Sequence, residues 1–127
     1  MALVQVKDAE GSVLDWMVAK CKGTPAVRMF ENSKGFRVYE NESMKMQGIN
    51  FAPSTNWSQG GPIIEKLRGE SNYSFLIEND GDEIYVLAWP TAHVMFKGRG
   101  ETLLVAAMRC YVSSVLGEEV EVPDELI

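Results

Sequence analysis

A β-hairpin pattern in the second half of the chain constrains the fold more than any other feature. Over residues 72–78 and 83–89, apolar and polar side chains alternate with a period of two, which is typical of half-buried strands. The segment between them, Asn79-Asp80-Gly81-Asp82, is rich in residues that form tight turns. An isolated hairpin is at best marginally stable in water, so other elements must cover its apolar side.

Three stretches with helical periodicity can provide that cover. Apolar residues recur at helical spacing over residues 13–21, 63–67 and 104–115. A further hairpin is predicted over residues 26–40, where turn residues lie between aromatic and β-branched ones. The predicted fold class is therefore α+β, with an antiparallel sheet of two hairpins packed with three helices, in the order α-β-β-α-β-β-α.

Four shorter segments complete the predicted organisation. Residues 2–7 are predicted to form an edge strand, and residues 93–96 a short strand that extends the second hairpin. Lys97-Gly98-Arg99-Gly100 is predicted to be a mobile basic loop. The acidic tail, residues 118–127, contains a proline and is expected to lie over the surface or to fray.

Length and charge indicate one folded domain that does not bind nucleic acid in general. The 127 residues suit a single domain, residues 1–127, that can bury a core without disulfides or metal. Eighteen acidic against twelve basic residues give a net charge of -6, whereas duplex-binding domains usually present a basic face. Mimicry of DNA is disfavoured too, because dense carboxylates occur only in the tail.

The N-terminal sequence predicts a location in the cytoplasm. The first residues, MALVQVKDAEG, have neither the charged start nor the long apolar stretch of a signal peptide. No apolar run is long enough to cross a bilayer, so no membrane association is expected.

The reactive side chains form no catalytic or metal-binding constellation. Cys21 and Cys110 do not make a Cys-x-x-Cys pair, and His93 is the single histidine, so a zinc site is not expected. Both cysteines fall in helical patterns and are predicted to be reduced, buried thiols. His93 lies in a predicted strand without a partner that would position it as a base. We therefore expect no cofactor, no metal and no catalytic residue.

The segment Asn56-Trp57-Ser58-Gln59-Gly60-Gly61-Pro62 has two interpretations. As a loop before a helix that begins near Gly61, it could bring backbone N–H groups and the positive end of a helix dipole to a phosphate or carboxylate, with Trp57 stacking on a base. As a structural loop, it would place Trp57 in the core and use its polar side chains as caps. The composition alone favours the structural interpretation, because such clusters build loops first.

Three basic residues are further candidates for ligand binding. Lys97 and Arg99 lie in the predicted mobile loop. Arg109 lies off the apolar stripe of the last helix, beside the small residues Ala106 and Ser113. It could line a pocket, contact another subunit or simply be exposed.

Four segments also resemble a known family. LDWMVAKC (14–21), APSTNWSQGGPIIE (52–65), LVAAMRCYV (104–112) and GEEVEVPDEL (117–126) are similar to the NinX-like small proteins of tailed phages and prophages of enterobacteria. The resemblance implies a phage-encoded protein made in the bacterial cytoplasm, accessory to replication, with no established activity. The chain departs from the family pattern over residues 70–100, where relatives carry a longer aromatic-rich insertion.

These observations lead to three hypotheses of different classes. The first is a non-catalytic, homo-oligomeric protein that binds a small nucleotide-like ligand and sequesters a host anti-phage signalling molecule, with Asn56–Gly61, Lys97, Arg99 and Arg109 as its site. The second is an interaction module that inhibits or recruits a host or phage protein, to which the acidic surface and tail are suited. The third, an enzyme of unfamiliar type, has least support.

Overall fold

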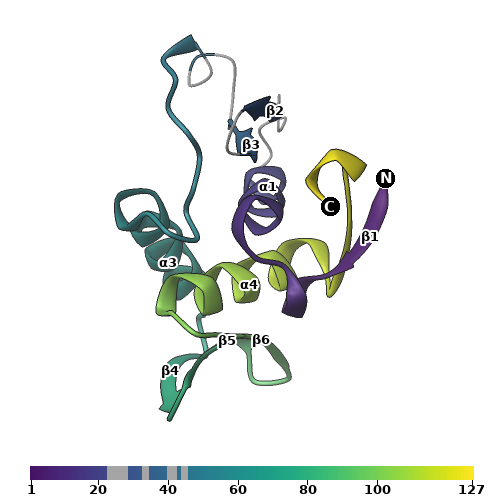
Figure 1. The fold of residues 1–127 in the computed structure, drawn as a ribbon. Helices are drawn as coiled ribbons and strands as arrows, with labels where there is room; N and C mark the ends of the chain where they lie inside the picture. Colours follow the sequence, from purple (N-terminus) through teal and green to yellow (C-terminus); the bar gives the residue numbers. More distant parts are fainter. Residues whose placement is uncertain (23–28, 33–34, 40–42, 44–45) are drawn as a thin grey trace.

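The computed structural model describes residues 1–22, 29–32, 35–39, 43 and 46–127. Its helices are α1 (Gly11–Cys21), α3 (Trp57–Glu70) and α4 (Leu103–Leu116), with short 3-10 helices η1 (Val6–Asp8) and η2 (Asp124–Leu126). Its strands are β1 (Ala2–Gln5), β2 (Met29–Asn32), β3 (Gly35–Val38), β4 (Ser74–Asp80), β5 (Glu83–Thr91), β6 (Val94–Gly100) and β7 (Glu119–Val122). The predicted α+β class is confirmed (Figure 1).

The strands within the described residues form three separate antiparallel sheets, so the prediction of one sheet built from two hairpins is wrong. β4, β5 and β6 make one sheet, β2 pairs with β3, and β1 pairs with β7. Figure 1 shows β2 and β3 beyond α1, and the β4–β5–β6 sheet on the other side of α4. The helices thus lie between the two hairpins. The ends of the hairpin predicted over 26–40, and its turn, include residues outside the described ranges.

The hairpin that the sequence predicts most clearly is confirmed. β4 and β5 are paired from Ser74 opposite Trp89 to Asp80 opposite Glu83. Gly81 takes a φ of 65° in the turn, a left-handed conformation that glycine adopts without steric cost. The strand predicted at 93–96 is longer than expected and forms β6, which pairs with β5.

Helix α4 is the centre of the core. Thr102 caps its N-terminus by accepting a hydrogen bond from the Val105 N–H at 3.2 Å, and Gly117 ends it. Buried residues lie on several sides of the helix rather than on one stripe. They are Leu104, Ala106, Ala107, Met108, Cys110, Tyr111 and Val112. Val115 is the last apolar residue of the stretch predicted over 104–115, and it is exposed instead of buried.

Gly98 allows α4 and β6 to approach closely. A Cβ added at Gly98 would collide with the carbonyl oxygen of Ala106 and the backbone nitrogen of Cys110. Any side chain here would force the helix away from the sheet. The prediction of a mobile loop over residues 97–100 is therefore wrong, because the glycine that suggested flexibility instead marks close backbone packing within a strand.

The C-terminal segment also differs from its prediction. Residues 119–122 form β7, which pairs with β1 from Gln5 opposite Glu119 to Ala2 opposite Val122. Val120 and Val122 are buried, whereas Glu119 and Glu121 are exposed. The alternation of valine and glutamate thus makes a half-buried strand, so this part of the tail is neither frayed nor merely laid over the surface.

Helix α3 begins at Trp57, four residues before the predicted start near Gly61. Pro62 consequently lies inside the helix instead of in its first turn. Gly60 faces the core, because a Cβ at this position would collide with the carbonyl oxygen of Pro53 and with the Leu104 side chain. The segment that looked like a flexible glycine loop is a helix start packed against α4.

This packing predicts opposite effects of alanine at two glycines of α3. We expect Gly60→Ala to lower the free energy of unfolding by about 1–3 kcal/mol, the usual cost of overpacking a core. A Cβ at Gly69 would meet nothing within 4 Å. Gly69→Ala is therefore expected to raise the free energy of unfolding by up to about 1 kcal/mol, because alanine is the better helix former. Urea denaturation followed by circular dichroism measures both. Equal stabilisation by the two substitutions would contradict the close approach at Gly60.

Candidate functional site

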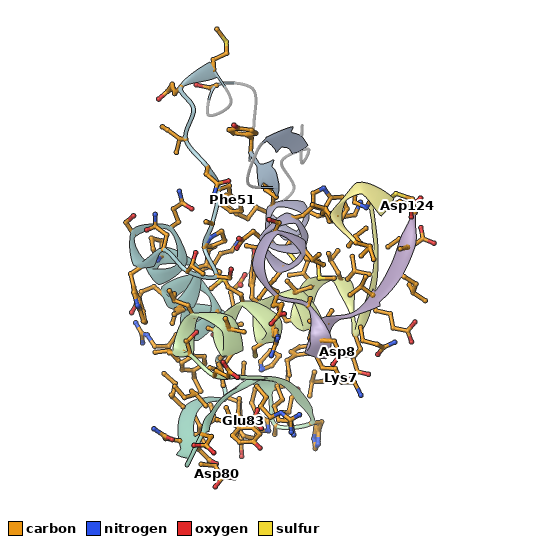
Figure 2. The ribbon with its side chains drawn as sticks, in the orientation of Figure 1. Lys7, Asp8, Phe51, Asp80, Glu83 and Asp124 are labelled. Carbon is orange, nitrogen blue, oxygen red and sulfur yellow. The ribbon has the colours of Figure 1, made fainter. Side chains whose placement is uncertain are left out.

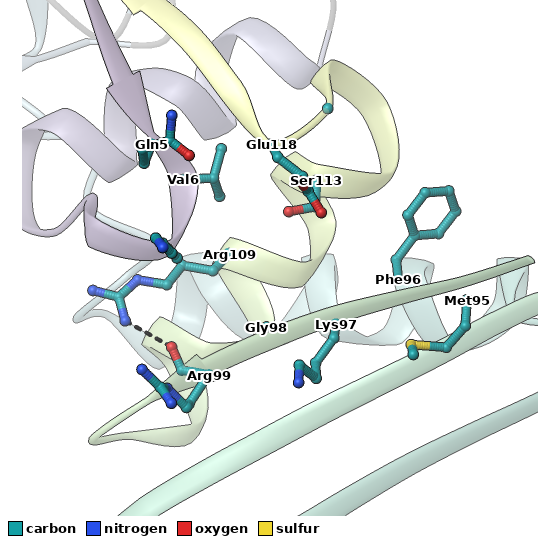
Figure 3. A pocket seen from close by; sticks show the side chains of 12 residues that line it. Gln5, Val6, Met95, Phe96, Lys97, Gly98, Arg99, Arg109, Ser113 and Glu118 are labelled. Atoms are coloured by element: carbon teal, nitrogen blue, oxygen red, sulfur yellow. Dashed lines mark hydrogen bonds between the residues drawn. The ribbon is translucent and has the colours of Figure 1, made fainter.

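A groove of about 700 Å³ runs between β6, the C-terminal half of α4 and the β1–η1 segment. Its lining includes Lys97 and Arg99 from β6, Arg109 and Ser113 from α4, and Lys7 from η1 (Figure 3). Figure 2 shows Lys7 and Asp8 where η1 descends toward the sheet. The fold thus brings together the three basic residues singled out in the sequence and adds a fourth.

Arg109 ties the three walls of the groove together. Its Nε donates to the carbonyl oxygen of Ala9 at 2.9 Å, and its Nη1 donates to the carbonyl oxygen of Arg99 at 2.6 Å. Burial lowers the pKa of the guanidinium, and the nearby charges of Glu10 and Asp8 oppose that change. Arginine stays charged in proteins, so this half-buried group is a fixed positive charge in the groove.

Lys97 and Arg99 stand on the rim of the groove. They point to the side of β6 opposite Phe96, as Figure 3 shows. Arg99 forms an ion pair with Glu83 at 3.0 Å, and hydrogen bonding to Tyr85, together with the charge of Glu83, raises the pKa of Arg99. The Lys97 ammonium lies 5.6 Å from the ring centroid of Tyr85. Both side chains are exposed.

The groove is positively charged in a protein that is negative overall. Among the described residues that line it, Lys7, Lys97, Arg99 and Arg109 are basic and Glu118 is acidic, and the carboxylates of Asp8, Glu10 and Glu83 act on Arg109 from nearby. The chain as a whole carries a net charge of -6. A concave surface that concentrates one sign of charge attracts ligands of the opposite sign, so an anion is the preferred occupant.

None of the candidate residues from 56 to 61 lines this groove. Asn56 caps α3 by accepting hydrogen bonds from the Ser58 N–H at 2.9 Å and from the Ser58 hydroxyl at 2.6 Å. Gln59 accepts from the Ala52 N–H at 2.6 Å and donates to the Asn50 carbonyl at 3.0 Å. These side chains serve the local structure, as the structural interpretation of the segment predicts.

Trp57 does not take the position in the core that the structural interpretation gave it. It is 57% exposed, so it does not plug the core. It is the first residue of α3, and the N–H groups of Gln59 and Gly60 that follow it already bond to the Asn56 carbonyl. The segment is therefore a poor cradle for a phosphate, although the indole face remains accessible.

The other reactive groups do not gather into a site. Burial raises the pKa values of Cys21 and Cys110 to about 12, which leaves both thiols protonated and unreactive at neutral pH. His93 lies exposed in the turn between β5 and β6 and not in a strand, so its predicted position is wrong. Among the residues that the structure describes, no group of His, Cys, Asp and Glu could hold a metal ion.

Asp15 is a buried carboxylate outside the groove. It is 5% exposed, and its Oδ1 accepts a hydrogen bond from the Ser54 N–H at 2.9 Å, which joins α1 to the segment before α3. Burial raises its pKa to about 6, against the opposing effect of hydrogen bonding to Ser54. It does not line the groove, and its hydrogen bond to Ser54 indicates a structural role.

Sequence reasoning placed Ser113 beside Arg109 on a face that could line a pocket, but it missed Lys7 and Phe96 as groove residues. Lys7 belongs to η1, and its distance in sequence from β6 and α4 hides their proximity. Phe96 looked like an ordinary strand position. The alternation of side chains over residues 94–100 could have indicated the strand β6, but Gly98 and Gly100 obscured it.

Comparison with known proteins supplies the family. The family model described as Bacteriophage P22, NinX matches residues 5–114, which is most of the chain. The chain belongs to the NinX family. The match covers α1, α3, the β4–β5–β6 sheet and all but the last two residues of α4, and thus every groove residue except Gly117 and Glu118. No curated protein matches the chain. As a member of the NinX family it is a phage protein, and none of its described helices is long and apolar enough to cross a membrane.

The raised pKa of Asp15 predicts how stability depends on pH. The carboxyl holds its proton more tightly in the folded chain, with a pKa of about 6, than at the ordinary value of 3.8. Its contribution to the free energy of unfolding therefore falls as the pH rises from about 4 to about 6, by up to about 3 kcal/mol.

Asp15→Asn tests this directly, because the amide oxygen can still accept from Ser54 but carries no charge. We expect the variant to be more stable than the native chain at about pH 7 and to lose that advantage near pH 4. Urea denaturation across this pH range measures the difference. A stability difference that does not change with pH would show that the Asp15 pKa is not raised.

Proposed function

We propose that this phage protein binds a small, anionic, nucleotide-like ligand in the groove between β6, α4 and η1, without catalysing its conversion. We further propose that it thereby sequesters a host anti-phage signalling molecule. The observation that supports the proposal is that Lys7, Lys97, Arg99 and Arg109 are all among the residues lining one groove of a chain whose net charge is -6.

The dimensions of the groove support a ligand of nucleotide size. Its volume of about 700 Å³ falls within the roughly 300–1,000 Å³ that is usual for small-molecule sites. Phe96 adds an aromatic ring to the lining, and Ser113 adds a hydroxyl. Aromatic rings favour stacking with flat bases, whereas guanidinium groups favour phosphates, so the two ends of a nucleotide find matching chemistry.

Arg109 supports binding by a preorganised site. Its guanidinium is held by two backbone carbonyls, and a cation already fixed in place loses little freedom when an anion arrives. Lys97 and Arg99, which are exposed on the rim, can then close on the ligand from β6. Among the described lining residues there is no histidine or cysteine, which favours binding over turnover.

The alternative proposal, an interaction module for a host or phage protein, loses one of its two supports. An exposed acidic tail was part of that argument, but residues 119–122 form β7. The overall acidity of the chain remains. Purification from infected cells distinguishes the two ideas, because a stoichiometric protein partner would favour the interaction module.

A matched pair of arginines tests ligand binding. Arg99 and Arg68 are both exposed, and each pairs with one glutamate, at 3.0 Å for Glu83 and 2.8 Å for Glu65. Only Arg99 lines the groove. We expect Arg99→Gln to weaken binding of a cyclic dinucleotide or ADP-ribose by about tenfold or more, which is the worth of a charge-assisted hydrogen bond, and Arg68→Gln to leave it unchanged.

Isothermal titration calorimetry with the purified proteins measures the ligand dissociation constants of both variants. Absence of heat with every cyclic dinucleotide and ADP-ribose derivative, at protein concentrations well above micromolar, would overturn the proposed function. Equal losses in the two variants would show that the ligand is attracted by general charge and not held in the groove.

A further inference from the structure

One edge of the β4–β5–β6 sheet borders the basic groove. In the described part of the chain, β6 pairs with β5 on one side and with no strand on the other. Residues 95–99 of β6 line the groove, and Gln5, Val6 and Lys7 line it from the β1–η1 segment (Figure 3). The unpaired edge of β6 therefore faces a hollow that has a second wall.

The groove has the size of one added strand. Residues 95–99 extend over about 13 Å, and a groove of about 700 Å³ along that length has a cross-section of about 50 Å². One strand in a packed sheet takes up about 4.8 Å by about 10 Å. An extended peptide of about four residues therefore fits beside β6.

The hydrogen bonds of Arg109 show which backbone groups of β6 point into the groove. Arg109 reaches the Arg99 carbonyl from α4 at 2.6 Å, so this carbonyl points into the groove and away from β5 (Figure 3). Backbone groups of alternate residues point to the same side of an antiparallel strand. The N–H and carbonyl of Lys97 therefore point into the groove as well.

The other side of β5 confirms this direction. The Trp89 carbonyl of β5 accepts a hydrogen bond from the Tyr73 N–H at 3.0 Å, so it points toward β4. Leu87 lies two residues earlier in β5 and points the same way. Its register partner in β6 is Lys97, whose backbone groups consequently face away from β5.

The Arg99 end of this edge offers donors without an acceptor. The Arg99 N–H points into the groove, but the Arg99 carbonyl is occupied by Arg109. Within the described residues, the Nη2 group of Arg109 has no acceptor, because Nε and Nη1 make its two hydrogen bonds, and Asp8 and Glu10 act on the guanidinium only through their charges. A carboxylate, which only accepts hydrogen bonds, suits this end.

We propose that the edge of β6 binds the C-terminal segment of a partner protein as a fourth strand, parallel to β6. In this arrangement the last residue of the partner donates its N–H to the Lys97 carbonyl. Its carboxylate then accepts from the Arg99 N–H and from Nη2 of Arg109. An antiparallel segment, or a parallel one that continued further, would bring an N–H to the occupied carbonyl of Arg99.

This inference goes beyond the proposed nucleotide-like ligand and does not rest on it. Both would use Arg109, so a bound nucleotide is expected to displace the peptide. Failure of peptide binding leaves the calorimetric test with nucleotides untouched, and the reverse also holds.

Peptides with matched backbone changes provide the first test. The probe is a fluorescein-labelled hexapeptide of alternating threonine and valine with a free C-terminal carboxylate. Fluorescence anisotropy with the full chain is expected to give a dissociation constant of about 1–100 μM. Amidation of the C-terminus and N-methylation of the last residue should each raise it about tenfold or more. N-methylation of the preceding residue should change it by less than about twofold, because that N–H points away from β6.

A pair of proline variants tests the edge itself. Lys97→Pro removes an N–H that points into the groove, and it should raise the dissociation constant about tenfold or more. Ile77→Pro is the control, because Ile77 faces away from β5 at the free edge of β4 by the same alternation. It should leave peptide binding unchanged, and circular dichroism shows whether each variant is folded.

Four outcomes would contradict the proposal. Absence of binding at about 1 mM chain would overturn it, as would equal weakening by the two N-methylations. Equal weakening by two folded proline variants would show that the peptide does not pair with β6. An unchanged dissociation constant after amidation would overturn the capture of a C-terminus. If a proline variant does not fold, the N-methylated peptides decide the question with the native chain.

Discussion

The close approach of α4 to β6 at Gly98 is the constraint on which the rest of the structure depends. Because Gly98 has no side chain, the helix backbone at Ala106 and Cys110 rests directly on the strand. This contact fixes the position of Arg109, whose guanidinium then reaches the carbonyl of Arg99 and, on its other side, that of Ala9. The groove is therefore a consequence of how the core is packed.

Patterns within one element predicted the fold well, and contacts between distant elements limited the prediction. The hairpin of β4 and β5 and the caps of α4 at Thr102 and Gly117 follow from local sequence. Gly98 and Gly100 in β6 suggested a loop. Their role in close packing becomes clear only when the position of α4 is known. Likewise, the glutamates of β7 concealed a strand whose partner, β1, lies at the other end of the chain.

The candidate site was predicted in part, for the same reason. Lys97, Arg99 and Arg109 were identified separately as basic residues, but their common groove, and the place of Lys7 in it, depend on the tertiary structure. The segment 56–61 was misjudged because its composition suggested a loop. Asn56 followed by Gln59 three residues later is the spacing of a helix start, and the structure confirms a helix there.

The central claim is that the basic groove, and not the Trp57 segment, receives the ligand. An NMR titration of the isotopically labelled protein with a cyclic dinucleotide tests it most directly. Our account predicts shifts of the backbone amides of Lys7, Lys97, Arg99 and Arg109, while the indole N–H of Trp57 stays unchanged. Shifts at Trp57 and Gln59 without shifts along β6 would contradict it.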